Sequence, residues 1–146
     1  MKKVALLLVS MFVLSLTVKA DDDKPIQVSE MPVVAQKIIK NYFPGRTVAM
    51  AKVEMDFMNK SYEVIFTNGD KVEFDKKGNW TNVDCEYSQV PAEIIPTAIR
   101  NYLSKHYPEA KVLQIDIDDR KKYDVELNNG FELKFDKRFR LIDVDR

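Results

Sequence analysis

Histidine and cysteine, which build many catalytic and metal centres, are almost absent from this sequence. Its 146 residues include one histidine, His106, and one cysteine, Cys85. Histidine metal clusters and nucleophile–base triads need partners that the chain does not provide. One cysteine cannot form an internal disulfide, so the fold must rest on its hydrophobic core. We therefore expect no enzyme, no cofactor and no metal site.

The sequence also lacks an excess of basic charge once the first twenty residues are set apart. Lys2 and Lys3 precede an uncharged run that ends in Val18-Lys19-Ala20, which predicts a secretory signal peptide over residues 1–20. The run is short for a membrane span of roughly 20 apolar residues, and an uncleaved anchor is the alternative. Without those three lysines, 20 basic side chains face 23 acidic ones, a net charge of −3. We expect a periplasmic or secreted protein that binds neither nucleic acid nor anionic membranes.

One stretch of the sequence occurs twice. Residues 62–84, YEVIFTNGDKVEFDKKGNWTNVD, return as residues 123–145, YDVELNNGFELKFDKRFRLIDVD, with identical Y, V, N, G, F, D, K, V and D. Each copy alternates apolar and polar residues on both sides of an Asn-Gly pair, which predicts antiparallel strands with one wet face. A helical pattern and another alternating strand precede each copy. The sequence thus predicts two tandem α-β-β-β-β repeats and an α+β fold of eight strands, with the helices packed on one face.

The register of the duplicated hairpin follows from its alternation. A two-residue Asn-Gly loop would place the apolar residues of its two strands on opposite faces. A three-residue loop, 128–130, instead pairs Leu127 with Phe131 and keeps them together. We therefore predict three-residue turns in both hairpins, with positive φ at Gly69 and Gly130.

The remaining segments have simpler patterns. The first helix starts near Pro32 and ends before Pro44; the second starts near Val90 and either bends or breaks at Pro96. The charged segment 21–30 is expected to be flexible. Residues 31–85 form repeat 1 and residues 86–146 form repeat 2, and the two repeats are expected to join into one compact body. Inward-facing positions are predicted for Ala51, Val53, Met55, Leu113, Ile115, Ile117, Thr81, Val83, Cys85, Ile142 and Val144.

The sequences YFPGRTV and HYPEAKV after the helices, with FTNGDKVEFDKKGNW and LNNGFELKFDKRF in the hairpins, resemble the PepSY-like proteins of the β-lactamase-inhibitor-like fold. The resemblance covers nearly all of the chain beyond residue 20. It implies a small secreted bacterial protein in which helical elements cover one side of an antiparallel sheet. It implies no known enzymatic activity or cofactor, and no motif here carries over the contact residues of the inhibitor.

Several single residues invite a chemical role that the pattern does not favour. His106 lies at a helix end, where it can meet the negative end of the helix dipole. Cys85 lies on an alternating strand, which favours a small buried hydrophobe over a reactive thiol. Asp116, Asp118 and Asp119 lack the glycine and distal glutamate of a calcium loop, so we expect a solvated hairpin end.

The two repeats differ at two places that suit a protein contact. Repeat 1 is longer near Met55, Phe57 and Met58, which puts apolar side chains at a hairpin tip, although the tip could also fold back under a helix. Trp80 replaces the Leu141 of repeat 2, and alternation turns it toward the open face, where it could anchor a partner or cap the sheet edge. We therefore expect a non-catalytic module that inhibits or chaperones another exported protein. A small-molecule or metal carrier of the cell envelope is the alternative.

Overall fold

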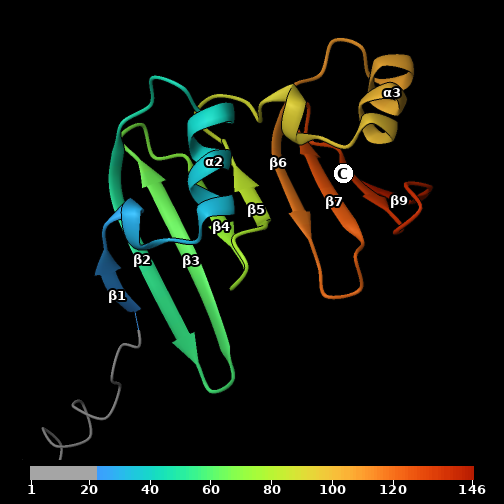
Figure 1. Ribbon diagram of the computed structural model, residues 1–146. Helices are drawn as coiled ribbons and strands as arrows, with labels where there is room; N and C mark the ends of the chain where they lie inside the picture. Colours follow the sequence, from blue (N-terminus) through green and yellow to red (C-terminus); the bar gives the residue numbers. More distant parts are fainter. Residues whose placement is uncertain (1–22) are drawn as a thin grey trace, which may run out of the picture.

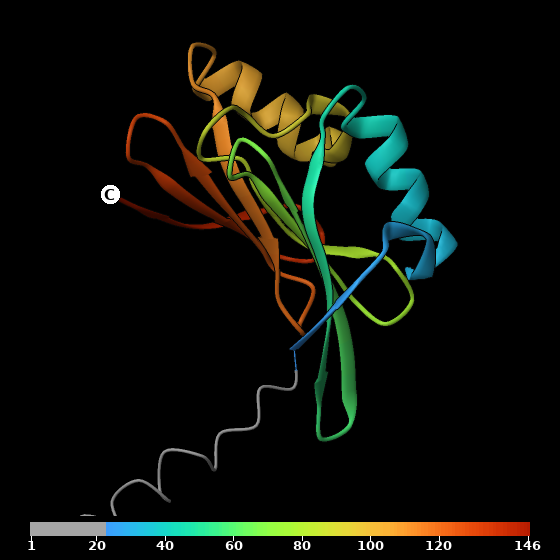
Figure 2. The same ribbon diagram turned by 90° about the vertical axis from the view of Figure 1, so that its left-hand side faces the viewer.

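Nine strands form one antiparallel sheet in the computed structural model, which describes residues 23–146. The predicted signal peptide lies outside the described residues. The strands follow one another in chain order across the sheet: β1 (Asp23–Ile26), β2 (Val48–Asp56), β3 (Asn59–Phe66), β4 (Lys71–Phe74), β5 (Trp80–Asp84), β6 (Val112–Ile117), β7 (Tyr123–Leu127), β8 (Glu132–Phe135) and β9 (Leu141–Asp145). Helices α2 (Val33–Tyr42) and α3 (Thr97–His106) lie on the same face of the sheet (Figures 1 and 2). The architecture is α+β, as predicted.

Strand β1, which the sequence did not predict, corrects the expectation of a flexible segment for residues 23–30. Residues 23–26 form β1 along the edge of β2, and Lys52 Nζ lies 2.9 Å from Asp23 Oδ2 across the pair. The next residues form a short 3-10 helix, η2 (Val28–Glu30), and Ile26 and Val28 pack against the core. The charge run alone indicated a frayed end, whereas the structure gains a strand pairing that satisfies the backbone of β2.

The register predicted for the duplicated hairpins is confirmed. The Leu127 N–H donates to the Phe131 carbonyl at 2.9 Å, and the Gly130 N–H donates back to the Leu127 carbonyl at 3.1 Å. Gly69 and Gly130 have φ of +96° and +90°. The paired residues across the hairpins are those expected: Tyr62–Phe74, Val64–Val72, Tyr123–Phe135 and Val125–Leu133.

Proline sets where both helices begin. Pro32 immediately precedes α2 and Pro96 immediately precedes α3, and their fixed φ suits the start of a helix. The segment upstream of Pro96 forms a separate 3-10 helix, η3 (Ala92–Ile94). Of the two alternatives at Pro96, the helix therefore breaks there.

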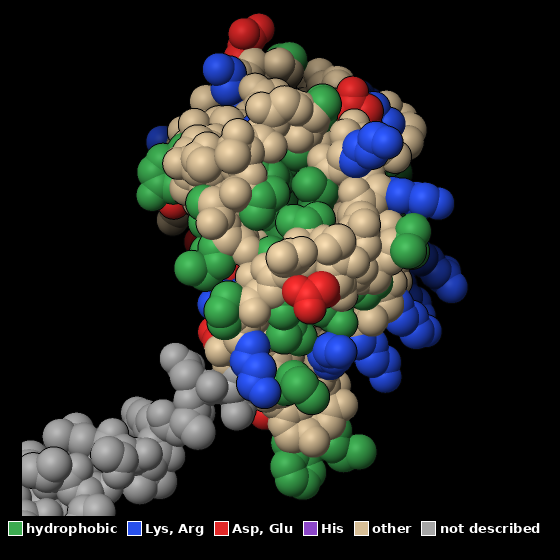
Figure 3. Space-filling view, turned by 60° about the vertical axis from the view of Figure 1, so that its left-hand side comes forward, with side chains coloured by type: hydrophobic (Ala, Val, Ile, Leu, Met, Phe, Trp, Pro, Cys, Tyr) green, Lys and Arg blue, Asp and Glu red, His purple; other side chains and the backbone are tan. Residues whose placement is uncertain are grey.

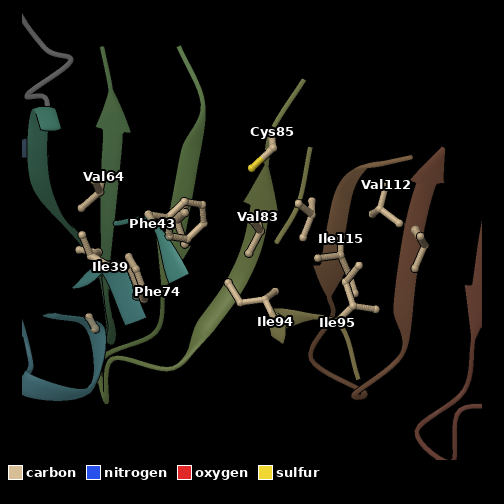
Figure 4. Packing of buried hydrophobic residues seen from close by; sticks show 14 of the residues in the cluster. Ile39, Phe43, Val64, Phe74, Val83, Cys85, Ile94, Ile95, Val112 and Ile115 are labelled. Carbon is tan, nitrogen blue, oxygen red and sulfur yellow. The ribbon is translucent and has the colours of Figure 1, made fainter. Parts of the chain in front are cut away.

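The core lies between the sheet and the two helices and runs through both halves of the chain (Figure 4). Strand β5 pairs with β6, which places Val83 opposite Ile115 and makes one continuous sheet from the two halves. Ile94 and Ile95 lie beside Val83 and Ile115 in the same core (Figure 4). The largest fully buried side chains come from both halves: Phe66, Phe74, Phe135, Ile99, Ile115, Leu127 and Leu133.

Three inward positions predicted from alternation, Leu113, Thr81 and Ile142, are wrong because each lies at a bulge, and two others, Met55 and Val144, are exposed. A bulge between Val112 and Gln114 puts Val112 in the core, 6% exposed, and leaves Leu113 only half-buried. Met55 is 52% exposed because it lies far out on the β2–β3 hairpin. A bulge between Lys134 and Phe135 puts Leu141, and not Ile142, opposite Phe135, so Ile142 is 48% exposed. Val144 lies opposite Leu133 as expected but is 41% exposed on the edge strand β9. No helix of residues 23–146 is long and apolar enough to cross a membrane.

Candidate functional site

The tip of the β2–β3 hairpin carries the most exposed apolar side chains of the described chain. The strands pair as far as Asp56 and Asn59, so Phe57 and Met58 form the turn itself. Phe57 is 100% exposed and Met58 83% exposed. Figure 3 shows hydrophobic side chains at this end of the molecule, beyond the rest of the surface. The tip does not fold back under a helix, which was the alternative to exposure.

Trp80 does not lie on the open face of the sheet. A bulge between Glu73 and Phe74 places Asn82 opposite Glu73 but Trp80, rather than Thr81, opposite Phe74. Trp80 therefore shares the face of Phe74, where the helices lie, and packs half-buried against the core. The prediction that it anchors a partner on the open face is wrong. The structure does not bring Trp80 together with the hairpin tip.

Trp80 instead lines a groove between the two halves of the molecule. The groove has a volume of about 410 Å³ and lies where α2 and η3 flank the inner face of the sheet. Sequence reasoning missed it, because its walls come from segments far apart in the chain that each read as ordinary core. Its lining residues are Ile38, Tyr42, Asn79, Trp80, Glu93, Ile94, Pro96, Ile117 and Tyr123.

The open face of the sheet is acidic. A hollow of about 190 Å³ on this face is lined by Gln114, Asp116, Asp124, Glu126 and Glu132. Burial raises the pKa of Asp116, and the negative charges of Asp124 and Asp118 raise it further. Lys134 Nζ approaches Asp124 Oδ1 to 3.6 Å, so the face is only partly neutralised. Nevertheless, residues 23–146 hold no group of three or more His, Cys, Asp or Glu placed to ligate a metal ion.

Asp70 is a buried carboxylate with a complete set of partners. Asp70 is 1% exposed. Its carboxylate forms an ion pair with the Arg46 guanidinium and accepts a hydrogen bond from the Ser88 hydroxyl. The Asn68 amide and the Tyr87 N–H donate to it at 3.0 and 3.1 Å. Burial alone would raise the pKa of Asp70, but these hydrogen bonds outweigh burial and lower it. Asp70 thus ties the β3–β4 turn to the segment that joins the two halves, and this arrangement is structural.

The single cysteine and the single histidine also lie in structural surroundings. Cys85 is fully buried, and burial, together with the charge of Asp70, raises its pKa to about 12. A thiol in that state is neither a nucleophile nor a ligand at neutral pH. His106 lies in the last turn of α3, with its ring centroid 4.3 Å from that of Tyr102 one turn earlier. Cys85 is the buried hydrophobe that the alternation predicts.

Known proteins share this arrangement. A family model described as "Putative beta-lactamase-inhibitor-like, PepSY-like" matches residues 60–143, more than half of the chain. The chain belongs to the PepSY-like family. No curated protein matches it. The resemblance noted from the hairpin motifs is confirmed.

Solved structures of Bacteroides proteins have similar sequences and the same fold. A B. vulgatus protein described as a "putative periplasmic protein from DUF2874 family" is 56% identical, covering 88% of this chain and 100% of its own, with a TM-score of 0.84. A B. thetaiotaomicron protein described as a "putative calcium-regulated periplasmic protein" is 59% identical. The match covers 88% of this chain and 100% of that protein, with a TM-score of 0.83. Another B. vulgatus periplasmic protein, of unknown function, is 34% identical over 85% of this chain and 99% of its own, with a TM-score of 0.77. This PepSY-like protein is periplasmic, as predicted.

Proposed function

We propose that this PepSY-like protein is a non-catalytic binding module of the periplasm, built from two tandem α-β-β-β-β repeats. It contacts another exported protein, which it inhibits or chaperones, through the hairpin tip formed by Met55, Phe57 and Met58. The acidic open face of the sheet forms the flank of this contact. A partner with an apolar pocket beside a basic surface fits both features.

The observation that carries the proposal is the difference between the tips of the two equivalent hairpins. The β2–β3 tip exposes Phe57 and Met58, whereas the five residues that connect β6 to β7, residues 118–122, are all charged. The fold therefore does not require an apolar tip. Burying the two apolar side chains in a partner would contribute roughly 1.5–3 kcal/mol each, enough to dominate a small interface.

The non-catalytic part of the proposal has support from the chemistry of the described residues. Asp70 is buried and its oxygens are already engaged by Arg46, Ser88, Asn68 and Tyr87. Cys85 is buried and protonated at neutral pH. Neither group offers a substrate the exposed, activated atom that nucleophilic or acid–base catalysis needs.

A pull-down with a matched pair of variants tests the proposal. Wild-type protein, the variant Phe57→Ser with Met58→Ser, and the control Asp119→Ser with Arg120→Ser are immobilised and exposed to the periplasmic fraction. We expect a partner that wild type and the control retain and the tip variant loses, with the loss reproduced by calorimetry on the purified partner. Equal retention by all three proteins contradicts the proposal.

Calcium binding is a second candidate function, favoured by the carboxylate-lined hollow on the open face. Asp116 lies opposite Asp124, and the hollow they share also has Glu126 and Glu132 on its wall. Ca²⁺ takes roughly 6–8 oxygen ligands, and the 59% identical relative is described as calcium-regulated. In residues 23–146 no three of these side chains are already placed to ligate one ion, so calcium binding would have to draw the carboxylates together.

Thermal unfolding with calcium, with magnesium and with a chelator tests this second candidate. Stabilisation by calcium that disappears in Asp116→Asn with Asp124→Asn supports it. The exposed pair Glu86→Gln with Glu109→Gln, which does not line the hollow, is the control and should retain the effect. An identical melting temperature with calcium and with chelator contradicts the candidate.

A further inference from the structure

The groove around Trp80 is a built concave site that the hairpin tip does not explain. Its volume of about 410 Å³ lies within the range of small-molecule sites, roughly 300–1,000 Å³. Tyr42 comes from the end of α2, Trp80 from the start of β5 and Tyr123 from the start of β7. Small-molecule sites commonly lie between two such structural units, where each unit supplies one wall.

The apolar part of the groove can contact a hydrocarbon or aromatic part of a ligand. Ile38, Ile94 and Ile117 lie on its wall beside the three aromatic side chains, and Ile38, Trp80 and Tyr123 pack against the core from beneath. Because these side chains are held by the core, they present their surfaces to the groove at little entropic cost on binding. The apolar walls therefore suit a ligand whose main part is apolar or aromatic.

The charge of the groove has one sign. Glu93, an exposed residue of η3, is the ionisable acid among the lining residues, and none of them is Lys, Arg or His. Burial raises the pKa of Tyr123, so its phenol adds no negative charge at neutral pH. Indole and phenol rings attract cations to their faces, with Trp the strongest of the three aromatic types. A carboxylate beside such rings complements an ammonium group.

We propose that this groove binds a small organic cation, a molecule with an apolar or aromatic body and one ammonium group. The body lies against Trp80 and the isoleucines, and the ammonium group meets Glu93. This site is separate from the hairpin tip, so it goes beyond the proposed partner contact and does not depend on it. The corresponding position of repeat 2 carries Leu141 instead of Trp80, so the aromatic wall belongs to the groove and is not a requirement of the repeat.

The protein supplies its own reporter for this site, because Trp80 is its single tryptophan. Three probes that share a phenyl ring and a two-carbon chain separate charge from shape: 2-phenylethylammonium is cationic, 2-phenylethanol neutral and phenylacetate anionic. Titration of the purified protein, followed by Trp80 fluorescence, measures the affinity for each. We expect the cation to bind about tenfold more tightly than the alcohol, and phenylacetate not to bind.

Two variants assign the effect to the groove. Glu93 is exposed on η3, so Glu93→Gln leaves the core intact; it should bring the cation to the affinity of the alcohol. Tyr42→Leu should weaken binding of the cation several-fold, and adding Glu93→Gln to it should weaken binding further. Glu109→Gln, at an exposed acid after α3, is the control and should bind like wild type.

Three results overturn the proposal: no fluorescence change with the cationic probe up to millimolar concentration, equal affinity for cation and alcohol, or unchanged cation affinity in Glu93→Gln. The tip variant Phe57→Ser with Met58→Ser should bind the cation normally. A failure at the groove and a failure at the tip are therefore distinguishable.

Discussion

Replacement of Asp70 by Ala should destabilise the protein more than replacement of any surface acid. The change removes a carboxylate, 1% exposed, that engages Arg46, Ser88, Asn68 and the backbone of Tyr87. Removing one partner of a buried ion pair costs about 3–5 kcal/mol. The Arg46 side chain is 26% exposed and can regain some water, so we expect the lower end, about 3 kcal/mol.

The matched control for Asp70 is the partly exposed ion pair between Asp23 and Lys52, in which neither side chain is fully buried. Its side chains are 31% and 24% exposed, and such surface pairs contribute at most about 1 kcal/mol. Urea unfolding at pH 7 of wild type, Asp70→Ala and Asp23→Ala measures both losses. If the two variants lose equal stability, or if Asp70→Ala loses less than about 1 kcal/mol, Asp70 does not tie the hairpin to the linker.

The same network predicts a dependence on pH. The hydrogen bonds lower the folded-state pKa of Asp70, so its contribution is fully present above the unfolded-state pKa, about 3.9, and is lost as the pH falls through the lower folded-state value. The stability difference between wild type and Asp70→Asn should therefore be constant from pH 5 to 7 and shrink in more acidic solution. A difference that stays constant down to the most acidic solution tested would contradict this assignment.

Three further predictions concern packing and the tip. Gly130→Ala should lower the unfolding free energy by about 1 kcal/mol because Gly130 has a positive φ. Gly78→Ala should lower it more, because a Cβ there would also lie 2.8 Å from the backbone of α2. Urea unfolding of both variants compares the two losses. Cys85 should resist iodoacetamide in the native protein at pH 8 and react once urea unfolds it, whereas rapid native alkylation would show an exposed thiol. Phe57→Ser with Met58→Ser should change the unfolding free energy by less than about 0.5 kcal/mol, and a larger loss would mean that the tip has a structural role.

The features that sequence predicts well are those set by neighbouring residues. Alternation with period two fixed the hairpin register, because a shift of one residue would turn Leu127 and Phe131 to opposite faces. The same logic placed positive φ at Gly69 and Gly130. Apolar residues in a turn indicated the tip, but its exposure was one of two alternatives, and only the structure distinguishes them.

The features that sequence missed depend on distant segments. Strand β1 forms because its residues pair with the edge of β2. The charged residues at the start of this segment do not indicate that pairing. A single bulge between Glu73 and Phe74 turned Trp80 to the helix face. The groove needs walls from both halves, so Tyr42, Glu93 and Tyr123 could not be grouped before the fold was known.

The most direct test of the central claim, that the β2–β3 tip binds another exported protein, is photo-crosslinking in the living cell. A photoreactive phenylalanine analogue replaces Phe57 in one strain and Asp119, at the equivalent tip of the second half, in another. We predict one discrete crosslinked partner from position 57 and none from position 119. No adduct from position 57, or the same adducts from both positions, would contradict the claim.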